Sequence, residues 1–220
     1  YFGDAQNSIL SFWSRIIRAA YKKAPHAAFS IHAGDLVNTA HKDREWAEWF
    51  KAGGWIHSSV PSIPVSGNHE YTNLKVDGVD KGKQLAIQWR SQFSLPPASD
   101  LPDSLAETVY TLTYQGARII ALNSNREIEA QAKWLEKVLS ENTSKWTIVT
   151  MHHPMFSSGA GRDNSKNRKV LKPIIDKYKV DLLLQGHDHT YARGHTPVRM
   201  SDTENNKIKS LYVNSVSGPK

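Results

Sequence analysis

Five short apolar runs constrain the fold of this chain, because each one ends in a polar motif. The runs have the length and the composition of buried strands. In open α/β sheets, ligands bind beyond the carboxyl ends of the strands. The five strand ends that carry motifs are Phe2 to Asp4, Ile31 to Asp35, Val65 to His69, Val149 to His152 and Leu184 to His189.

Convergence of these strand ends would gather two carboxylates, one amide oxygen and three imidazoles at one site. The set exceeds the four positions of a tetrahedral zinc ion. It suits two six-coordinate ions that share a bridging carboxylate. One Gly-Asp after a strand is usually only a turn, so the prediction depends on all five motifs occurring in order. The predicted metal ligands are Asp4, Asp35, Asn68, His152, His187 and His189.

Length and composition limit the class of protein. A chain of 220 residues is expected to form one domain. It has no cysteine, which excludes disulfides and thiolate ligands. The formal charge of +7 fits an anionic substrate, and a solvated basic surface is the competing interpretation. Because the basic residues are scattered, nucleic acid is expected only as a substrate. No apolar run reaches the roughly 18 residues of a membrane span, and nothing in the sequence predicts an oligomeric state.

Apolar periodicity predicts strands that alternate with helices, interrupted by one hairpin over residues 108–122. Residues 71–83 and 157–169 show no periodicity and are expected to be loops. This pattern predicts a layered α/β domain with mixed sheets. The expected helices lie at 8–20, 44–55, 89–93, 128–139 and 170–178, and two strands are expected near the end of the chain, at 196–200 and 210–214.

The ordered motifs resemble those of the calcineurin-like metallophosphoesterases. Glu70, and the run Thr190-Tyr191-Ala192-Arg193, are similar to the purple acid phosphatase branch of that family. The resemblance spans nearly the whole chain. It implies a four-layer αββα sandwich with two mixed β-sheets, and a single catalytic domain over residues 1–220 whose first strand is cut short at Tyr1. The motifs that carry it are Gly3-Asp4, Gly34-Asp35-Leu36-Val37-Asn38, Gly67-Asn68-His69-Glu70, Val149-Thr150-Met151-His152 and Gly186-His187-Asp188-His189.

The resemblance also implies a role for each ligand. Asp35 would bridge both metals. Asp4 and His189 would hold the first ion, and Asn68, His152 and His187 would hold the second.

Further roles follow for the neighbours of these ligands. His69 would sit over the site, contact the phosphoryl oxygens and serve as the first candidate for general acid, because the usual pKa of histidine lies near the working pH. His153 is the second candidate. Glu70 and Asp188 are expected to orient ligating histidines.

Two positions depart from the family pattern. The purple enzymes carry a tyrosine ligand where this chain has Asn38, and many relatives carry a histidine where it has Gln6. Either side chain could supply a neutral oxygen to the first metal. Such oxygens favour Mn²⁺, Fe²⁺ or Zn²⁺ over a firmly held Fe³⁺. The expected cofactor is therefore a pair of divalent or trivalent ions (Fe, Mn or Zn) in a colourless protein.

The predicted activity is hydrolysis of small phosphate monoesters by attack of a metal-bridging hydroxide. A phosphodiesterase or nuclease on the same metal centre is the alternative, and a non-catalytic binding module is the third hypothesis. Tyr191, Arg162 and Asn164 are candidate substrate contacts, although a solvated loop also explains Arg162 and Asn164. The family resemblance alone favours a secreted or periplasmic location.

Overall fold

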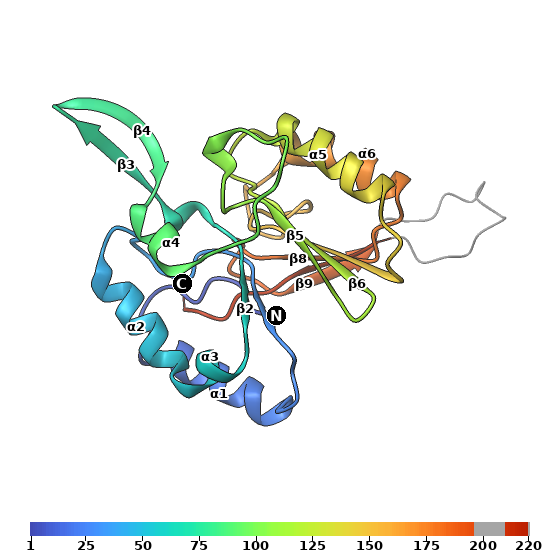
Figure 1. Ribbon diagram of the computed structural model, residues 1–220. Helices are drawn as coiled ribbons and strands as arrows, with labels where there is room; N and C mark the ends of the chain where they lie inside the picture. The colour runs from blue at the N-terminus through green and yellow to red at the C-terminus, as the bar shows by residue number, and fades with distance from the viewer. Residues whose placement is uncertain (196–209, 220) are drawn as a thin grey trace.

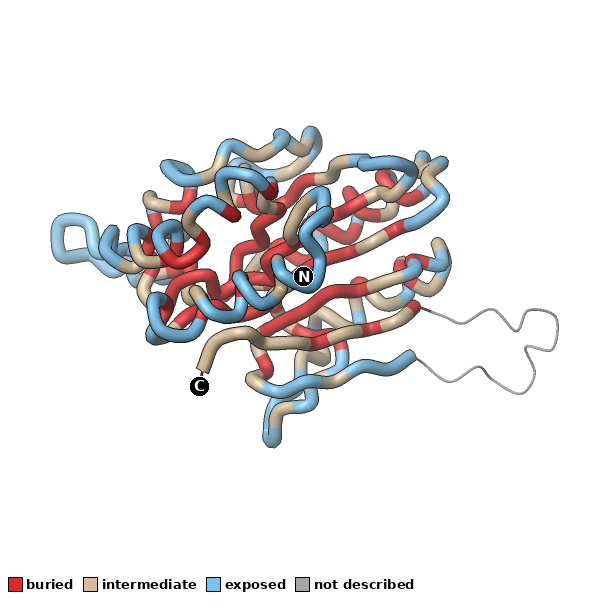
Figure 2. The backbone as a smooth tube through the Cα atoms, turned by 90° about the horizontal axis from the view of Figure 1, so that it is seen from below, coloured by how far each residue is buried: buried red, intermediate tan, exposed pale blue. Residues whose placement is uncertain are grey.

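The structure is a computed structural model that describes residues 1–195 and 210–219. Two sheets lie inside and helices cover both outer faces, so the chain forms four layers (Figure 1). This is the predicted αββα arrangement, and its larger sheet is mixed as expected. Buried positions run through the interior along the strands, and exposed positions lie on the outside (Figure 2).

The smaller sheet carries the motifs of the N-terminal part of the chain. Its strands β1 (Ser30–His32) and β2 (Ser62–Pro64) pair in parallel. Phe2 adds a parallel bridge to His32, which aligns the first motif with the second. The helices α1 (Trp13–Lys23), α2 (Asp43–Gly53) and α3 (Trp55–Ser59) cover its outer face (Figure 1). Between sheet and helices lies a core that contains the fully buried indoles of Trp13, Trp46 and Trp49.

The larger sheet has six strands in the spatial order β5-β6-β7-β8-β10-β9. Its four central strands run parallel, and the strand at each edge runs antiparallel to its neighbour. Parallel central strands place the motifs after β7 and β8 at the same edge of the sheet. The strands are β5 (Tyr110–Tyr114), β6 (Ala117–Ala121), β7 (Trp146–Thr150), β8 (Leu182–Gln185), β9 (Ala192–His195) and β10 (Leu211–Asn214).

Alternation along the strands of the larger sheet builds two separate cores. On β6, Ile119 packs toward the smaller sheet and Ile120 packs toward the helices α5 (Ile128–Ser140) and α6 (Ser165–Lys177). The phenol of Tyr110 links the two sheets by donating to the backbone oxygen of Pro64 at 2.7 Å. The smaller and the larger sheet are therefore each covered on both faces. This packing holds in place the loops that follow the carboxyl ends of their strands.

Residues 71–83, expected to be a loop, form most of an antiparallel hairpin instead. Its strands are β3 (Tyr71–Val76) and β4 (Val79–Leu85), and it projects from the body of the molecule (Figure 1). Most of its residues are exposed on both faces, so the sequence shows no alternation of apolar and polar positions. Asp77 and Gly78 at its tip both have positive φ, as a tight two-residue hairpin turn requires.

Element boundaries differ from the predictions at several places. The helix expected from Asn7 or Ser8 begins only at Trp13, because both residues take left-handed backbone conformations. A short helix, α3, follows Gly54 and was not predicted. Helix α6 begins at Ser165, so it takes up part of the segment 157–169 that was expected to be a loop.

The other expected helices are present, and α4 covers Ile87–Gln92. Single 3₁₀ turns cover Asn68–Glu70 and Asp103–Leu105. The strand expected at 196–200 lies outside the described residues. Within the described ranges, no helix has both the length and the apolar character needed to cross a membrane.

Candidate metal centre

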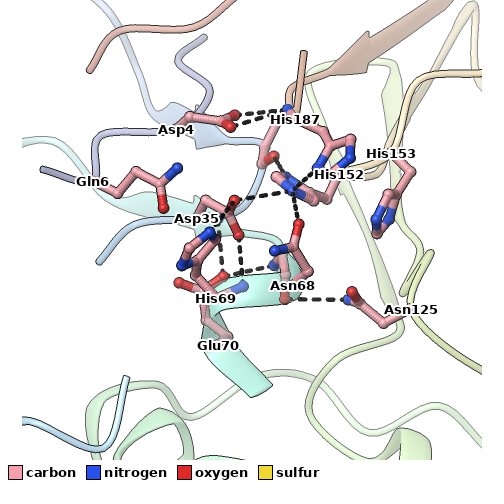
Figure 3. A network of polar contacts seen from close by, with 12 residues as sticks. Asp4, Gln6, Asp35, Asn68, His69, Glu70, Asn125, His152, His153 and His187 are labelled. Atoms are coloured by element: carbon pink, nitrogen blue, oxygen red, sulfur yellow. Dashed lines mark hydrogen bonds and ion pairs between the residues drawn. The ribbon is translucent and has the colours of Figure 1, made fainter. Parts of the chain in front are cut away.

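The six predicted ligands come from five loops that meet beyond the carboxyl ends of strands of both sheets, and Figure 3 shows all of them except His189. Asp4, Asp35 and His187 have positive φ values of 46°, 50° and 69°. Few non-glycine residues adopt this backbone conformation, and it concentrates at functional sites. The strained turns direct these side chains toward one another across the edges of the two sheets.

Glycines in the motifs make room for side chains of other motifs. An ideal Cβ on Gly67 would lie 2.2 Å from Asp35 Oδ1, and one on Gly186 would lie 2.3 Å from Asp4 Oδ1. Both distances are far shorter than any van der Waals contact, so a side chain at either position would displace a carboxylate. The Gly-Asn-His and Gly-His-Asp-His motifs therefore need glycine for close packing between loops.

His152 lies at the centre of the cluster (Figure 3). Its Nδ1–H donates to the backbone oxygen of Ala33 at 2.9 Å, so Nε2 faces the site. Around Nε2 lie Asn68 Oδ1 at 3.0 Å, Asp35 Oδ2 at 3.2 Å and His187 Nδ1 at 3.2 Å. The two oxygens are acceptors, and the His187 nitrogen joins them when its proton is on Nε2, so a metal cation could bind the lone pairs of all three atoms.

A second group forms around Asp4. Its carboxylate accepts the backbone N–H of His187 at 2.9 and 3.1 Å, and Oδ2 lies 3.5 Å from His189 Nε2. Gln6 Nε2 lies 3.2 Å from the same nitrogen of His189. Gln6 Oε1 is buried and has no hydrogen-bond partner among the described residues. An orphaned oxygen beside an imidazole and a carboxylate is the kind of atom that a cation would satisfy.

The charges of the cluster also fit a cation. Asp4 and Asp35 are both 1% exposed, and each offers a ligand atom within 4.8 Å of the other and of His152. Burial, together with the charge of Asp35, raises the pKa of Asp4 to about 7. Burial would also raise the pKa of Asp35, but the adjacent His152 outweighs it and lowers the value to about 2. Two buried carboxylates at this separation need positive charge between them, and the residues present fit a metal.

Glu70 braces the site through backbone groups. Its buried carboxylate accepts the N–H groups of Asp35 at 2.9 Å, Leu36 at 2.9 Å and Gly67 at 2.6 Å. It thus ties the loop after β1 to the loop after β2. Orientation of a histidine ring by Glu70 stays a prediction, because the hydrogen bonds described for its carboxylate are with backbone amides.

Asp188 holds a different loop. Its Oδ2 accepts from Ser157 Oγ at 2.5 Å and from the N–H groups of Ser158 and Gly159 at 2.7 and 2.9 Å. Asp188 therefore anchors residues 157–159 to the His187–His189 turn. These contacts replace the histidine-orienting role predicted for it.

His69 lies beside Asp35, and its predicted position over a bound substrate stays a prediction. Its backbone N–H donates to Asp35 Oδ1 at 2.9 Å, and its Nε2 lies 3.9 Å from Asp35 Oδ2. Its Nδ1–H donates to the backbone oxygen of Asn38 at 2.7 Å, which leaves Nε2 toward the site. Asn38 contributes this carbonyl, while its exposed side chain contacts Thr39.

His153 lies next to His187, with ring centroids 4.4 Å apart. Ser124 Oγ accepts the backbone N–H of His153 at 2.9 Å and lies 2.8 Å from its Nδ1. Burial and the neighbouring imidazoles lower the pKa of His153 to about 2, so the ring is neutral. If the hydroxyl donates to Nδ1, the ring proton is on Nε2, where it can donate to a substrate oxygen.

The segment that follows β6 also supports the site, although it was not among the predicted site residues. Asn125 Nδ2 donates to the backbone oxygens of Ser66 and Gly67 at 3.1 and 3.3 Å, and so supports the Asn68 turn. Ser124 holds His153 through its hydroxyl, which contacts the backbone N–H and the ring of His153. The run Ala117–Ala121 also ends in a polar motif, Asn123-Ser124-Asn125, so the strand-end argument applied to the other five runs could have identified it.

Three predicted substrate contacts have different surroundings. Arg162 Nη1 donates to the backbone oxygen of His187 at 2.8 Å and to Asp188 Oδ1 at 3.3 Å, so it braces that turn. Asn164 Nδ2 donates to Pro154 O at 2.9 Å, and the residue lines a hollow beside the cluster. Tyr191 is 66% exposed and does not line that hollow. Their roles in substrate binding stay predictions.

The sequence model described as calcineurin-like phosphoesterase matches residues 2–191, which include all five motifs. The chain belongs to this family. The match confirms the resemblance drawn from the motifs, and the four layers described above are the fold of this family's solved members. The family also supports a metal-dependent hydrolase as the general class of function.

Individual relatives point to the purple acid phosphatase branch. The chain is 24% identical to probable purple acid phosphatase 20 of Arabidopsis thaliana, over 94% of this chain and 49% of that protein. It is 27% identical to probable inactive purple acid phosphatase 24 of the same plant, over 86% of this chain and 32% of that protein. The chain thus spans about a third to a half of the length of these curated relatives.

A solved structure has the same fold. Purple acid phosphatase PPD1 from seeds of yellow lupin (Lupinus luteus) superimposes with a TM-score of 0.76 and 21% sequence identity. The match covers 99% of this chain and 43% of the lupin chain. This similarity supports the layered architecture. The function has to be inferred from the residues of the site.

Proposed function

We propose that this chain hydrolyses phosphate monoesters at a centre of two metal ions. The observation that supports this most is the surroundings of His152 Nε2, where three acceptor atoms of Asp35, Asn68 and His187 lie within 3.2 Å. A metal cation at this point would bind the lone pairs of all of these atoms, which makes the arrangement a suitable ligand set. In this family, the cation would serve phosphate ester hydrolysis.

The proposed ligand sets follow the two groups of side chains. Asp4, Asp35 and His189 would hold one ion, with the orphaned Gln6 oxygen in reach of the same group. Asp35, Asn68, His152 and His187 would hold the other. When bound, such ions lower the pKa of water and offset the charge of a phosphoryl group.

The metals are proposed to be Fe, Mn or Zn. Asn38 cannot provide the phenolate that colours purple enzymes. We therefore expect the iron-loaded protein to lack an intense visible charge-transfer band, which an absorption spectrum would check. A strong visible band would show that another residue supplies a phenolate.

Residues of this chain would carry the remaining steps. His69 Nε2 faces the site because Nδ1 is held by Asn38 O, so His69 can give a proton to the leaving oxygen. His153 is neutral and lies between the cluster and the hollow, where it can donate to a phosphoryl oxygen. Ser124 and Asn125 keep His153 and the Asn68 turn in place.

We also propose that residues 1–220 act as one catalytic domain. The candidate ligands come from both sheets, and Glu70 and Asp188 tie their loops together. Neither sheet holds a complete ligand set alone. Separation of the chain between β4 and β5 should therefore abolish metal binding.

The central test compares two substrates on metal-replete protein. Phosphate release from nitrophenyl phosphate should exceed turnover of bis-nitrophenyl phosphate with at least one of Fe, Mn or Zn. The variant Asp35→Ala should lose metal content and activity together, because Asp35 is proposed to contact both ions. Metal content would be measured by elemental analysis of the dialysed protein.

Two outcomes would favour the competing functions. Faster turnover of the diester would support a phosphodiesterase or nuclease. A protein that binds no metal under replete conditions would be a binding module, consistent with one relative being named a probable inactive phosphatase.

A further inference from the structure

A hollow of about 400 Å³ opens beside the candidate metal centre. Asn68 and His153 line this hollow. Asn68 is also a proposed metal ligand beside His152, and His153 contacts His187. The hollow therefore shares a wall with the candidate metal centre. Its remaining walls come from the base of the β3–β4 hairpin, the segment after β6 and the start of α6. The volume suits a small organic group.

The charges around this hollow are mainly positive. Lys83 from β4, Arg126 from the segment after β6 and Lys166 from α6 all line it. Asp163 is the one carboxylate among the described lining residues, and both of its oxygens bind Arg168, at 2.6 and 3.2 Å. The charge of Asp163 is thus partly offset by Arg168, and the three cations outnumber this single carboxylate.

The three cations are held differently. Arg126 is fixed, since its Nη2 donates to the backbone oxygen of Lys83 at 2.6 Å and its guanidinium lies 5.0 Å from the ring centroid of Tyr71. Lys83 and Lys166 are exposed, so their ammonium groups can reorient toward a ligand. Lys166 lies 3.4 Å from Glu129, but both side chains are mostly exposed, and such a pair is weak.

We propose that this hollow binds the leaving group of the substrate and selects phosphate esters whose leaving group carries a second anion, such as a carboxylate. The inference rests on the proposed function. The reacting phosphoryl group would lie at the metal cluster, and the rest of the molecule would extend past His153 into the hollow. Its anion would then face Lys83 and Lys166, with Arg126 adding fixed positive charge.

The test uses two esters that differ in one group. Glycerol 3-phosphate ends in a neutral CH₂OH group, and 3-phosphoglycerate ends in a carboxylate at the same position. Released phosphate gives kcat/KM for each ester on the metal-replete protein. The wild-type protein should prefer 3-phosphoglycerate, and the preference should weaken as salt screens the charges.

Single substitutions locate the effect in the hollow. Lys83→Ala and Lys166→Ala should each reduce the preference roughly two- to five-fold, the size expected for one exposed charge pair. Lys177→Ala is the matched control, because it removes the same charge at the far end of α6, where Lys177 pairs with Glu136. The control should retain the full preference.

The outcomes separate the two proposals. If both esters release phosphate with no preference between them, the inference is overturned and the proposed function is unaffected. The same holds if the preference survives in the Lys83→Ala/Lys166→Ala double variant. Absence of phosphate release from both esters and from nitrophenyl phosphate, with each metal, overturns the proposed function and the inference with it.

Discussion

At the scale of single residues, histidines with similar sequence surroundings acquire different roles from the atoms around them. His152 is fully buried among acceptors, and although burial alone would lower its pKa, the carboxylates of Asp35 and Asp4 raise it to about 10. His153, one position later, has its pKa lowered to about 2 by burial and neighbouring imidazoles. His152 therefore suits a position where positive charge lies between carboxylates, and His153 suits the role of a neutral hydrogen-bond donor.

Replacement of His69 tests the separation of chemistry from metal binding. The backbone N–H of residue 69 makes the contact with Asp35 Oδ1, so this contact survives in His69→Ala. We expect kcat to fall about 10²- to 10⁴-fold, the usual contribution of a general acid, with unchanged metal content. Exposed His26 supplies the control variant His26→Ala. Metal loss in His69→Ala would place the ring among the ligands instead.

At the scale of elements, the strands position the motifs and the loops after them lock together. Glycines let the loops approach, and the carboxylates of Glu70 and Asp188 bind the backbone amides of loops that meet at the site. The site is therefore pre-formed by contacts among loops. Two substitutions test this interlock.

The first substitution, Gly67→Ala, would place a Cβ 2.2 Å from Asp35 Oδ1. The carboxylate must move, and we expect metal affinity to fall about 10- to 100-fold, as for other changes that misplace a ligand. A metal titration against a competing chelator would measure the loss. Gly194→Ala is the control, since no atom lies within 4 Å of its Cβ position. Equal affinity in the two variants would show that the Asp35 loop has room to adjust.

The second substitution, Glu70→Gln, replaces a carboxylate oxygen with an NH₂ group that would face backbone N–H donors. Leaving such donors buried without acceptors costs about 2 kcal/mol. For a domain of this size, Tm should fall by roughly 4–8 °C in thermal unfolding. Glu48→Gln, which alters an exposed pair with Arg44, should shift Tm by far less. A similar Tm for both variants would contradict the bracing role.

At the scale of the whole molecule, one core contains ionisable groups that no proposed reaction uses. His32 and His57 lie among the indoles of Trp13 and Trp49 under the smaller sheet. Burial lowers the pKa of His32 well below 6.5, and burial lowers that of His57 to about 4. Both side chains must therefore stay neutral for this core to pack.

This predicts a loss of stability in acid. Unfolded histidine titrates near pH 6.5, so between pH 6.5 and 4 the unfolded chain binds more protons at these sites than the folded chain. Stability should fall as pH falls through this window. His57→Gln should lower Tm at pH 8, because His57 stacks on Trp49 with centroids 4.1 Å apart, but should flatten the decline toward pH 4. The readout is the slope of Tm against pH, and a slope equal to that of the wild type would exclude His57 as a source.

The sequence by itself determined the layered α/β class and indicated the five motifs of the candidate site. This was possible because strand composition, strand order and the residues after each strand are local properties of the chain. The β3–β4 hairpin also has a local signal, the turn at Asp77 and Gly78. Both faces of its strands are exposed, so the sequence lacks the alternation of apolar and polar residues that indicates a strand.

The tertiary structure alone decided which atoms those side chains meet. Glu70 binds three backbone amides, Asn125 supports the Asn68 turn, and Lys83 and Lys166 reach one hollow from separate elements. Apart from the contact between Glu70 and Gly67, these relations join residues far apart in the chain. The spacing of residues along the sequence does not give the distances on which such contacts depend. The five motifs thus indicate where the candidate metal centre lies, and the packing of their loops decides what surrounds it.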